Sequence, residues 1–170
     1  EAANIRYPME NFMGIWWSGS ENDVIPAGAA ATGYKALAFH QVNSDFAIFE
    51  DIQTYVVDKG LAAGAGDQIG TVLYNRGLYA AFLAHEAVKD AQAASGVGDI
   101  TPAMMRDAME ALEVTEAEMA SAGIPGFGPE FAVSCQNHGG DGLAGVSQWD
   151  AAAGVWNLID DFRPADADVV

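Results

Sequence analysis

The chain has 170 residues, 51% of them hydrophobic and 18% charged, a composition that is typical of a globular domain and excludes a disordered one. Its 24 acidic and 7 basic residues give a formal net charge of −17, which argues against nucleic acid or an anionic membrane as a partner because both require clustered lysines and arginines. No apolar run approaches the length of a membrane span, so direct membrane insertion is not expected.

The first element that the sequence predicts is a short strand over residues 12–17, which ends in two adjacent tryptophans. Neighbouring side chains of a strand face opposite sides, so one of Trp16 and Trp17 would enter a core while the other faces a cleft. A tryptophan beside the polar turn that starts at Ser18 suggests a surface that grips an organic ligand. The alternative is that both indoles fill the core.

A loop over residues 18–33 and a second strand over residues 34–42 follow. A helix that starts at Phe46 and ends at Gly60 comes next, since apolar residues recur there at helical spacing and glycine commonly ends a helix. A longer helix is expected to begin near Tyr74 or Asn75 and to run to Ala94.

The segment Tyr74-Asn75-Arg76-Gly77 is the second candidate ligand contact. At the start of a helix, free backbone N–H groups and the helix dipole favour a negative group of a ligand. Arg76 would add a bidentate partner for a carboxylate. The alternative is that Arg76 pairs with a carboxylate on the protein surface.

Two more helices and a set of strands complete the chain. Thr101-Pro102 and the capping box of Thr115 with Glu118 predict helix starts. Strands are predicted over residues 131–135, 143–149 and 155–159, and a frayed tail over 164–170. Helices between strands indicate α/β layers.

The sequence shows little sign of catalytic chemistry. Cys135 and His138 are close enough in sequence to form a nucleophile pair, but no local motif supports one, and a hydrolase that uses them is the less favoured alternative. Further ligands with suitable spacing for a metal are missing, so neither a metal nor a cofactor is expected. No catalytic residue is assigned, and the protein is not expected to be an enzyme.

Three stretches in order resemble the branched-chain amino-acid-type (type I) periplasmic substrate-binding proteins of ABC transporters. Phe12-Met13-Gly14 with its polar turn and Gly33-Tyr34 resembles the end of the second lobe. The stretch from Gly70 to Ala81 resembles the tyrosine-bearing helix after the second interlobe crossover. Val146 to Asp150, followed by Gly154 to Trp156, resembles the closing β-hairpin.

The resemblance implies a periplasmic-binding-protein-like α/β fold with two lobes and interlobe crossover strands, of which this chain would be an incomplete C-terminal segment. Residues 1–43 would end lobe two and include a crossover strand, residues 44–130 would form the helical part of lobe one, and residues 131–170 would supply the final crossover strands, the hairpin and the tail. A signal peptide and the N-terminal portion of both lobes would lie outside the sequence given.

The resemblance also implies a function, the capture of a small organic solute between the lobes and its delivery to an inner-membrane ABC permease, in the periplasm. The ligand-binding residues would be Trp16, Trp17 and Ser18 from lobe two, and Tyr74, Asn75 and Arg76 from lobe one. Amino-acid-binding members usually place an acid where this chain has Ile15 to Trp17. That departure favours an aromatic or aliphatic carboxylate, with a quaternary amine as the alternative. A ligand-sensing domain of the same fold is the alternative role.

Overall fold

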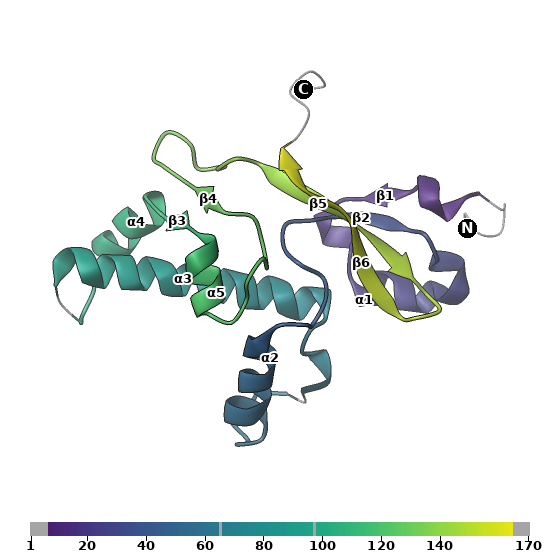
Figure 1. Cartoon of the computed structure of the whole chain (residues 1–170), viewed down its shortest axis with the longest axis horizontal. Coiled ribbons are helices and arrows are strands. Elements are labelled where there is room, and N and C mark those ends of the chain that lie inside the picture. The colour runs from purple at the N-terminus through teal and green to yellow at the C-terminus, as the bar shows by residue number, and fades with distance from the viewer. Residues whose placement is uncertain (1–6, 65, 97, 165–170) are drawn as a thin grey trace.

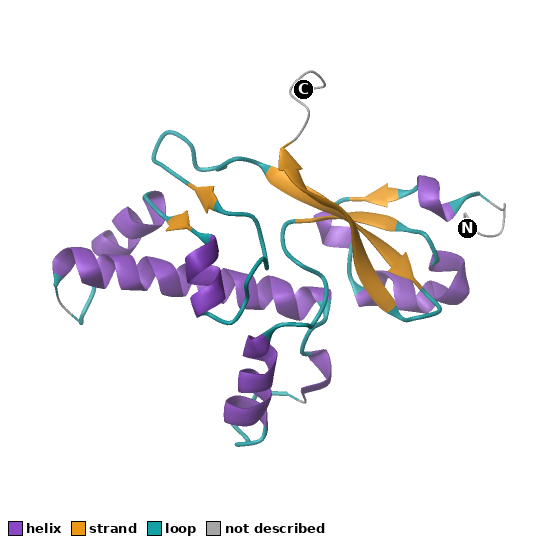
Figure 2. Cartoon of the chain, in the orientation of Figure 1, coloured by secondary structure: helices purple, strands orange, loops and turns teal. Residues whose placement is uncertain are grey.

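A four-stranded sheet organises one of the two packed bodies of the molecule (Figures 1 and 2). The computed structural model describes residues 7–64, 66–96 and 98–164. The sheet has the order β1-β2-β5-β6, with β1 parallel to β2 and the other pairs antiparallel. Its strands are β1 (Met13–Gly14), β2 (Lys35–Ala38), β5 (Leu143–Asp150) and β6 (Val155–Pro164).

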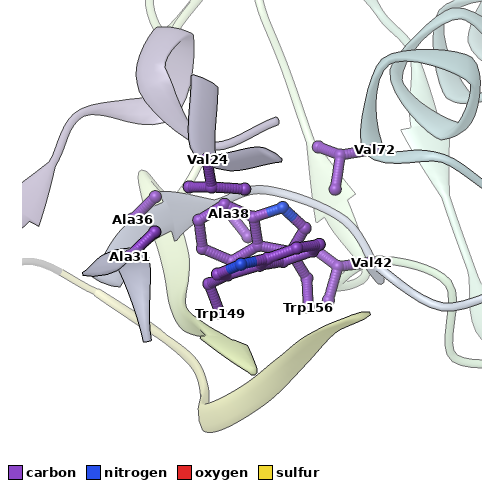
Figure 3. Close-up of a cluster of buried hydrophobic side chains, with 8 residues drawn as sticks. All are labelled: Val24, Ala31, Ala36, Ala38, Val42, Val72, Trp149 and Trp156. Carbon is purple, nitrogen blue, oxygen red and sulfur yellow. The ribbon is translucent and has the colours of Figure 1, made fainter. Parts of the chain in front are cut away.

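Short helical segments cover this sheet and close the first core. They are η2 (Met9–Asn11), η3 (Trp16–Ser18), α1 (Glu21–Val24) and η4 (Ile25–Ala31). Trp149 and Trp156 face each other across the β5–β6 hairpin with ring centroids 5.6 Å apart, and both are buried. Val24 and Val72 pack against these indoles from outside the sheet (Figure 3). Large rings therefore fill a core whose strand β2 contributes only alanines, at Ala36 and Ala38.

The second body is built around the long helix α3 (Val72–Ser95), with α4 (Pro102–Glu110) packed beside it (Figure 1). Its other elements are α2 (Ala47–Ile52), η5 (Gln53–Val57), η6 (Gly66–Gln68), α5 (Glu116–Ser121), and the two-stranded β3 (Glu113–Val114) and β4 (Phe131–Ala132). Phe127, Met119 and Ile124 are fully buried at the centre of this second core. Across the described residues, no helix combines the length and the apolar character needed to span a bilayer.

The first three turns of α3 join the two bodies. Val72 belongs to the first core and Phe82 to the second. The backbone N–H of Val72 donates to both carboxylate oxygens of Glu21, each at 3.2 Å, so an acid from α1 lies at the positive end of the helix dipole. The Asn75 side-chain amide, which is completely buried, donates to the carbonyl oxygens of Gln41 and Asn43 and so fixes the segment that links β2 to α2.

The predicted helices agree with the structure better than the predicted strands do. Thr101 and Thr115 cap α4 and α5 as their spacing predicts. The helix expected from Phe46 is present as α2 and continues through the π-helical segment η5, with Gly60 at a φ of 69° close after it. The long helix, however, begins at Val72, because Thr71 caps it by accepting from the N–H of Tyr74.

Several predicted strand limits are wrong. Only Met13 and Gly14 of residues 12–17 are in a strand, and the strand over 34–42 is limited to β2. The strand over 131–135 stops at Ala132, and the last strand extends past Ile159 to Pro164 because its partner β5 pairs that far. The predicted tail therefore begins later, and residues 165–170 lie outside the described residues.

His40 is buried between the two bodies and carries a pKa below its ordinary value of about 6.5. Its ring stacks on Phe127 at 5.7 Å, and Nδ1 lies 2.9 Å from the carbonyl oxygen of Gln41. Nε2 is buried with no hydrogen-bond partner among the described residues. Burial is the main cause of the lowered pKa, and the positive charge of Arg76 adds to it. The neutral imidazole is therefore the form that the fold accommodates.

We expect acid to destabilise the protein through His40. The unfolded chain takes up a proton at this histidine below about pH 6.5 while the folded chain resists it, so the free energy of unfolding falls as pH falls, by at most about 1.4 kcal/mol per pH unit for one group. Urea unfolding at pH 7.5 and 5.5 measures this loss, which should be smaller in His40→Gln. The exposed His138→Gln is the control, and an equal loss in His40→Gln and the wild type would contradict the assignment.

Candidate functional site

Trp16, Trp17 and Arg76 form a tryptophan–arginine cluster where the two bodies meet. The guanidinium carbon of Arg76 lies 4.0 Å from the ring centroid of Trp16 and 5.3 Å from that of Trp17. The two indole centroids are 4.9 Å apart. Nη2 of Arg76 donates to the backbone carbonyl of Trp16 at 2.8 Å, which fixes the cation over the ring. Residues 60 positions apart in sequence are thus joined by a cation–π contact and a hydrogen bond.

A tight turn places the indoles of Trp16 and Trp17 beside Arg76. The backbone N–H and the hydroxyl of Ser18 both donate to the carbonyl of Ile15, which closes the 3₁₀ turn η3. Tyr34 donates its hydroxyl proton to Oγ of Ser18 at 3.1 Å. Gly14 makes room for this bond, since a Cβ there would lie 2.1 Å from the Tyr34 oxygen. The expectation that a strand sends the two indoles to opposite faces is therefore wrong.

The positive charge of Arg76 has no salt bridge among the described residues. In the part of the chain that the structure describes, none of the ion pairs includes Arg76, so the alternative of a surface carboxylate partner is not realised there. Partial burial lowers the pKa of Arg76, and the negative charge of Asp23 opposes that shift. Nε of Arg76 is buried and has no hydrogen-bond partner among the described residues. The guanidinium therefore lacks an anionic partner at salt-bridge distance among the described residues.

The other predicted contacts divide into two groups. Ser18 lies next to the cluster with its hydroxyl engaged by Ile15 and Tyr34. Tyr74 packs on the second core, with its ring centroid 6.3 Å from that of Phe49. Asn75 is fully buried, and its amide nitrogen donates hydrogen bonds to backbone carbonyls of the segment after β2. The structure thus brings Trp16, Trp17, Ser18 and Arg76 together and places Tyr74 and Asn75 in the supporting structure.

The predicted anion site on the backbone of residues 74–77 is also wrong. These residues lie inside α3, and the N–H of Asn75 donates to the carbonyl of Thr71 at 2.9 Å. The N-terminal end of the helix is two residues earlier, where the Glu21 carboxylate already accepts from the N–H of Val72. Arg76 is consequently the group of this segment that can attract a negative ligand.

Phe39 is a residue of the site that sequence reasoning missed. Its ring centroid is 5.4 Å from that of Trp16, and the side chain is 37% exposed. Phe39 lies just past the end of β2, and Gly14 of β1 pairs with Ala36 in that strand. Parallel pairing of β1 with β2 is the signal that would have placed the residues after both strands at one edge of the sheet.

Among the described residues, neither Cys135 nor His138 has a hydrogen-bond partner that could activate it. Cys135 is exposed, and no hydrogen bond joins it to His138 among the bonds of the described residues. Within those residues, no group of three or more His, Cys, Asp and Glu side chains gathers in a way that could hold a metal ion.

Two solved structures resemble this chain, and both are ABC transporter components. One, described as an ABC transporter permease from the Pseudomonas fluorescens group, is 35% identical and superposes over 99% of this chain with a TM-score of 0.87. The other, a branched-chain amino acid ABC transporter protein from Thermus thermophilus with bound valine, is 20% identical over 96% of this chain, with a TM-score of 0.67. No known protein-family profile matches the chain, and neither does any curated protein.

These matches establish the fold. The chain has the α/β fold of the periplasmic-binding-protein type, and it spans 40% and 41% of the two solved chains. The predicted fold class is therefore confirmed.

Replacing Arg76 tests whether it orders the two indoles. Arg76→Met keeps an unbranched apolar side chain but removes the cation and the donor to Trp16, so we expect a changed near-UV circular dichroism spectrum. We also expect a loss of about 1–3 kcal/mol in the free energy of unfolding from the lost cation–π contact and hydrogen bond. Arg106→Met, on the exposed face of α4, is the matched control. Identical spectra for wild type and Arg76→Met would contradict the cluster.

Proposed function

We propose that this chain is part of the solute-binding component of an ABC importer. The component would capture a small organic solute, an amino acid or an aromatic or aliphatic carboxylate, between two lobes and deliver it to an inner-membrane permease. It would act in the periplasm and would catalyse no reaction. The fold and the two ABC transporter structures support this role, because binding proteins of this fold type are the importer's receptor.

The observation that carries the proposal is the arrangement of the tryptophan–arginine cluster. It combines an exposed indole, Trp17 at 70%, with a guanidinium that has no salt bridge among the described residues. Flat aromatic faces provide apolar contact area with few rotatable bonds, and the guanidinium supplies a directional partner for a carboxylate. Such a combination suits the recognition of a small organic anion.

The cluster also lies where a binding event can be coupled to motion. Trp16 and Trp17 belong to the sheet body, whereas Arg76 belongs to the helix that organises the second body. A solute that contacts both sides at once would favour the arrangement in which the two bodies approach each other. Closure then follows from stronger contacts in the closed state than in the open one.

Ser18, Tyr74 and Asn75 remain part of the proposed site, with different tasks. Ser18 keeps the turn of the tryptophans closed, and Asn75 holds the start of α3 against the segment after β2. Tyr74 is half-buried beside them and supports the second core. Contact of these three side chains with solute would require rearrangement on closure.

A ligand-sensing domain of the same fold is the second candidate role. The tryptophan–arginine cluster would bind solute in the same way, but the closed state would contact a receptor. Pull-down of the solute-loaded protein with a co-expressed ABC permease distinguishes the two roles.

Tryptophan fluorescence provides the direct test of solute binding. We expect one class in a panel of branched-chain amino acids, aromatic carboxylates, short fatty acids and betaines to give saturable quenching or a spectral shift in the full-length gene product. Arg76→Met should weaken binding of an anionic solute by about tenfold to a hundredfold, the size of a lost hydrogen bond to a charged group.

The controls separate site effects from folding effects. Trp17→Ala should reduce both the signal and the affinity, whereas Tyr55→Ala, which removes an exposed aromatic side chain of η5, should change neither. Unchanged affinity in Trp17→Ala and Arg76→Met would remove the site assignment. A folded protein that binds no member of the panel would count against a solute-binding role.

A further inference from the structure

A pocket of about 220 Å³, called the aromatic pocket below, lies where the sheet body meets the second body. Phe39, just past the end of β2, and Leu143, the first residue of β5, line it from the sheet body. Tyr79 of α3 and Phe131 of β4 line it from the second body. Pockets for drug-sized ligands usually measure roughly 300–1,000 Å³, so this one suits a smaller molecule.

Three aromatic rings, those of Phe39, Tyr79 and Phe131, line this pocket from three different parts of the chain. Phe39 makes a T-shaped contact with Trp16, and Tyr79 stacks on Phe82. Among the described residues, no ring contact joins two of the three lining rings to each other. The rings therefore surround the pocket without filling it, and a ligand can contact all three.

Asp141 supplies the charge of this pocket. Among the described residues that line it, no lysine, arginine or histidine is present. Gly140 and Gly142, on either side of Asp141, have φ angles of 60° and 61°, and the Asn137 side chain donates to the carbonyl of Gly140 at 3.1 Å. This tight turn holds Asp141 at the pocket. None of the salt bridges in the described part of the chain includes Asp141, so its carboxylate is available to a cation.

Tyr79 adds an aromatic face without adding charge. Burial raises the pKa of Tyr79 to about 12, so its hydroxyl is neutral at physiological pH. Its oxygen lies against Gly128, where a Cβ would be 2.9 Å away, so the ring has a fixed position. A cation in the pocket would therefore meet neutral aromatic rings and the carboxylate of Asp141. Aromatic faces attract cations through the ring quadrupole.

The chemistry of the walls selects among cations. A metal ion needs several oxygen ligands, and a primary ammonium needs acceptors for three N–H groups. The walls are mainly carbon, and within the described residues no group of three or more His, Cys, Asp and Glu side chains could hold a metal ion. A quaternary ammonium carries its charge on methyl groups that need no hydrogen bonds. It is therefore the cation that these walls suit best.

The tryptophan–arginine cluster does not supply this site. Arg76, Trp16 and Trp17 are not among the residues that line the pocket, and the rings of Trp16 and Phe39 lie between the guanidinium and the pocket. At the cluster, the indoles already contact the cation of Arg76. The aromatic pocket, in contrast, combines aromatic rings with a carboxylate and can accept a cation from solution.

We propose that the aromatic pocket binds a small quaternary ammonium ion. The methyl groups of the ion contact the rings of Phe39, Tyr79 and Phe131, and Asp141 balances its charge. This site is distinct from the tryptophan–arginine cluster, so the inference goes beyond the proposed function and does not depend on it.

Calorimetric titration of the full-length gene product with choline and with 3,3-dimethylbutan-1-ol tests the proposal. The alcohol has the shape of choline but no charge, so the comparison isolates the attraction of the rings and the carboxylate for a cation. We expect choline to bind about tenfold more tightly than the alcohol, as cation–π contacts in a partly desolvated site imply. Ethanolamine, a primary ammonium, should bind more weakly than choline. Equal affinities for choline and the alcohol would overturn the proposal.

Substitutions in the pocket identify the groups that recognise the charge. Phe131→Leu keeps an apolar side chain but removes a ring, so it should weaken choline several-fold and leave the alcohol unchanged. Asp141→Asn should likewise weaken choline and leave the alcohol unchanged. Asp99→Asn is the matched control, because it removes an exposed carboxylate outside the pocket, and both titrations should match the wild type.

Arg76→Met separates this inference from the proposed function, because it removes the cation of the cluster and should not weaken choline. Choline binding that is lost in Arg76→Met but retained in Phe131→Leu would overturn the assignment to the pocket. A folded protein that binds a carboxylate through Arg76 but does not bind choline would overturn this inference and leave the proposed function in place. Choline binding that depends on Phe131 and Asp141 supports the inference even where no carboxylate binds through Arg76.

Discussion

The start of α3 is the constraint on which the rest of the structure depends, because both cores and the candidate site share it. Val72 is anchored in the sheet core, and its N–H is held by Glu21. One turn later, the buried amide of Asn75 makes two hydrogen bonds to the segment after β2, each worth about 0.5–1.5 kcal/mol. Arg76 is the next residue, so the buried hydrogen bonds of Asn75 also fix the backbone that carries its guanidinium.

The tryptophan–arginine cluster is notable in a chain with a net charge of −17. Each of the four salt bridges among the described residues uses a basic side chain other than Arg76, and all four join residues that are one or three positions apart on the same element. Arg76 instead spans the two bodies and stacks on aromatic rings. A guanidinium is well suited to this role because it is flat and less strongly hydrated than an ammonium.

Sequence reasoning succeeded where local chemistry decides the structure. The threonine caps of α4 and α5 act within one turn, so their spacing alone predicts the helix starts. It failed at residues 12–17, because the 3₁₀ turn there depends on Tyr34 reaching Ser18 across a glycine, a contact between distant residues. The choice of Trp16, Trp17 and Arg76 as neighbours came from the family resemblance, since neither strand nor helix periodicity links positions that far apart. Phe39 escaped notice because only the parallel pairing of β1 with β2 brings it beside Trp16.

The charge of Arg76 has no salt bridge among the described residues, and this explains why the cluster would bind an anion although the chain is strongly acidic. Long-range repulsion from a net negative protein is screened within about 8–10 Å at physiological salt, so the local charge decides the outcome at contact distance. The indole faces stabilise the guanidinium partially, yet the buried Nε lacks a hydrogen-bond partner among the described residues and its desolvation is unrelieved. A carboxylate that reaches the outer guanidinium nitrogens would supply the opposite charge that none of the ion pairs among the described residues supplies. The unpaired charge of Arg76 and the indole faces beside it thereby define the chemistry of the molecule that would bind there.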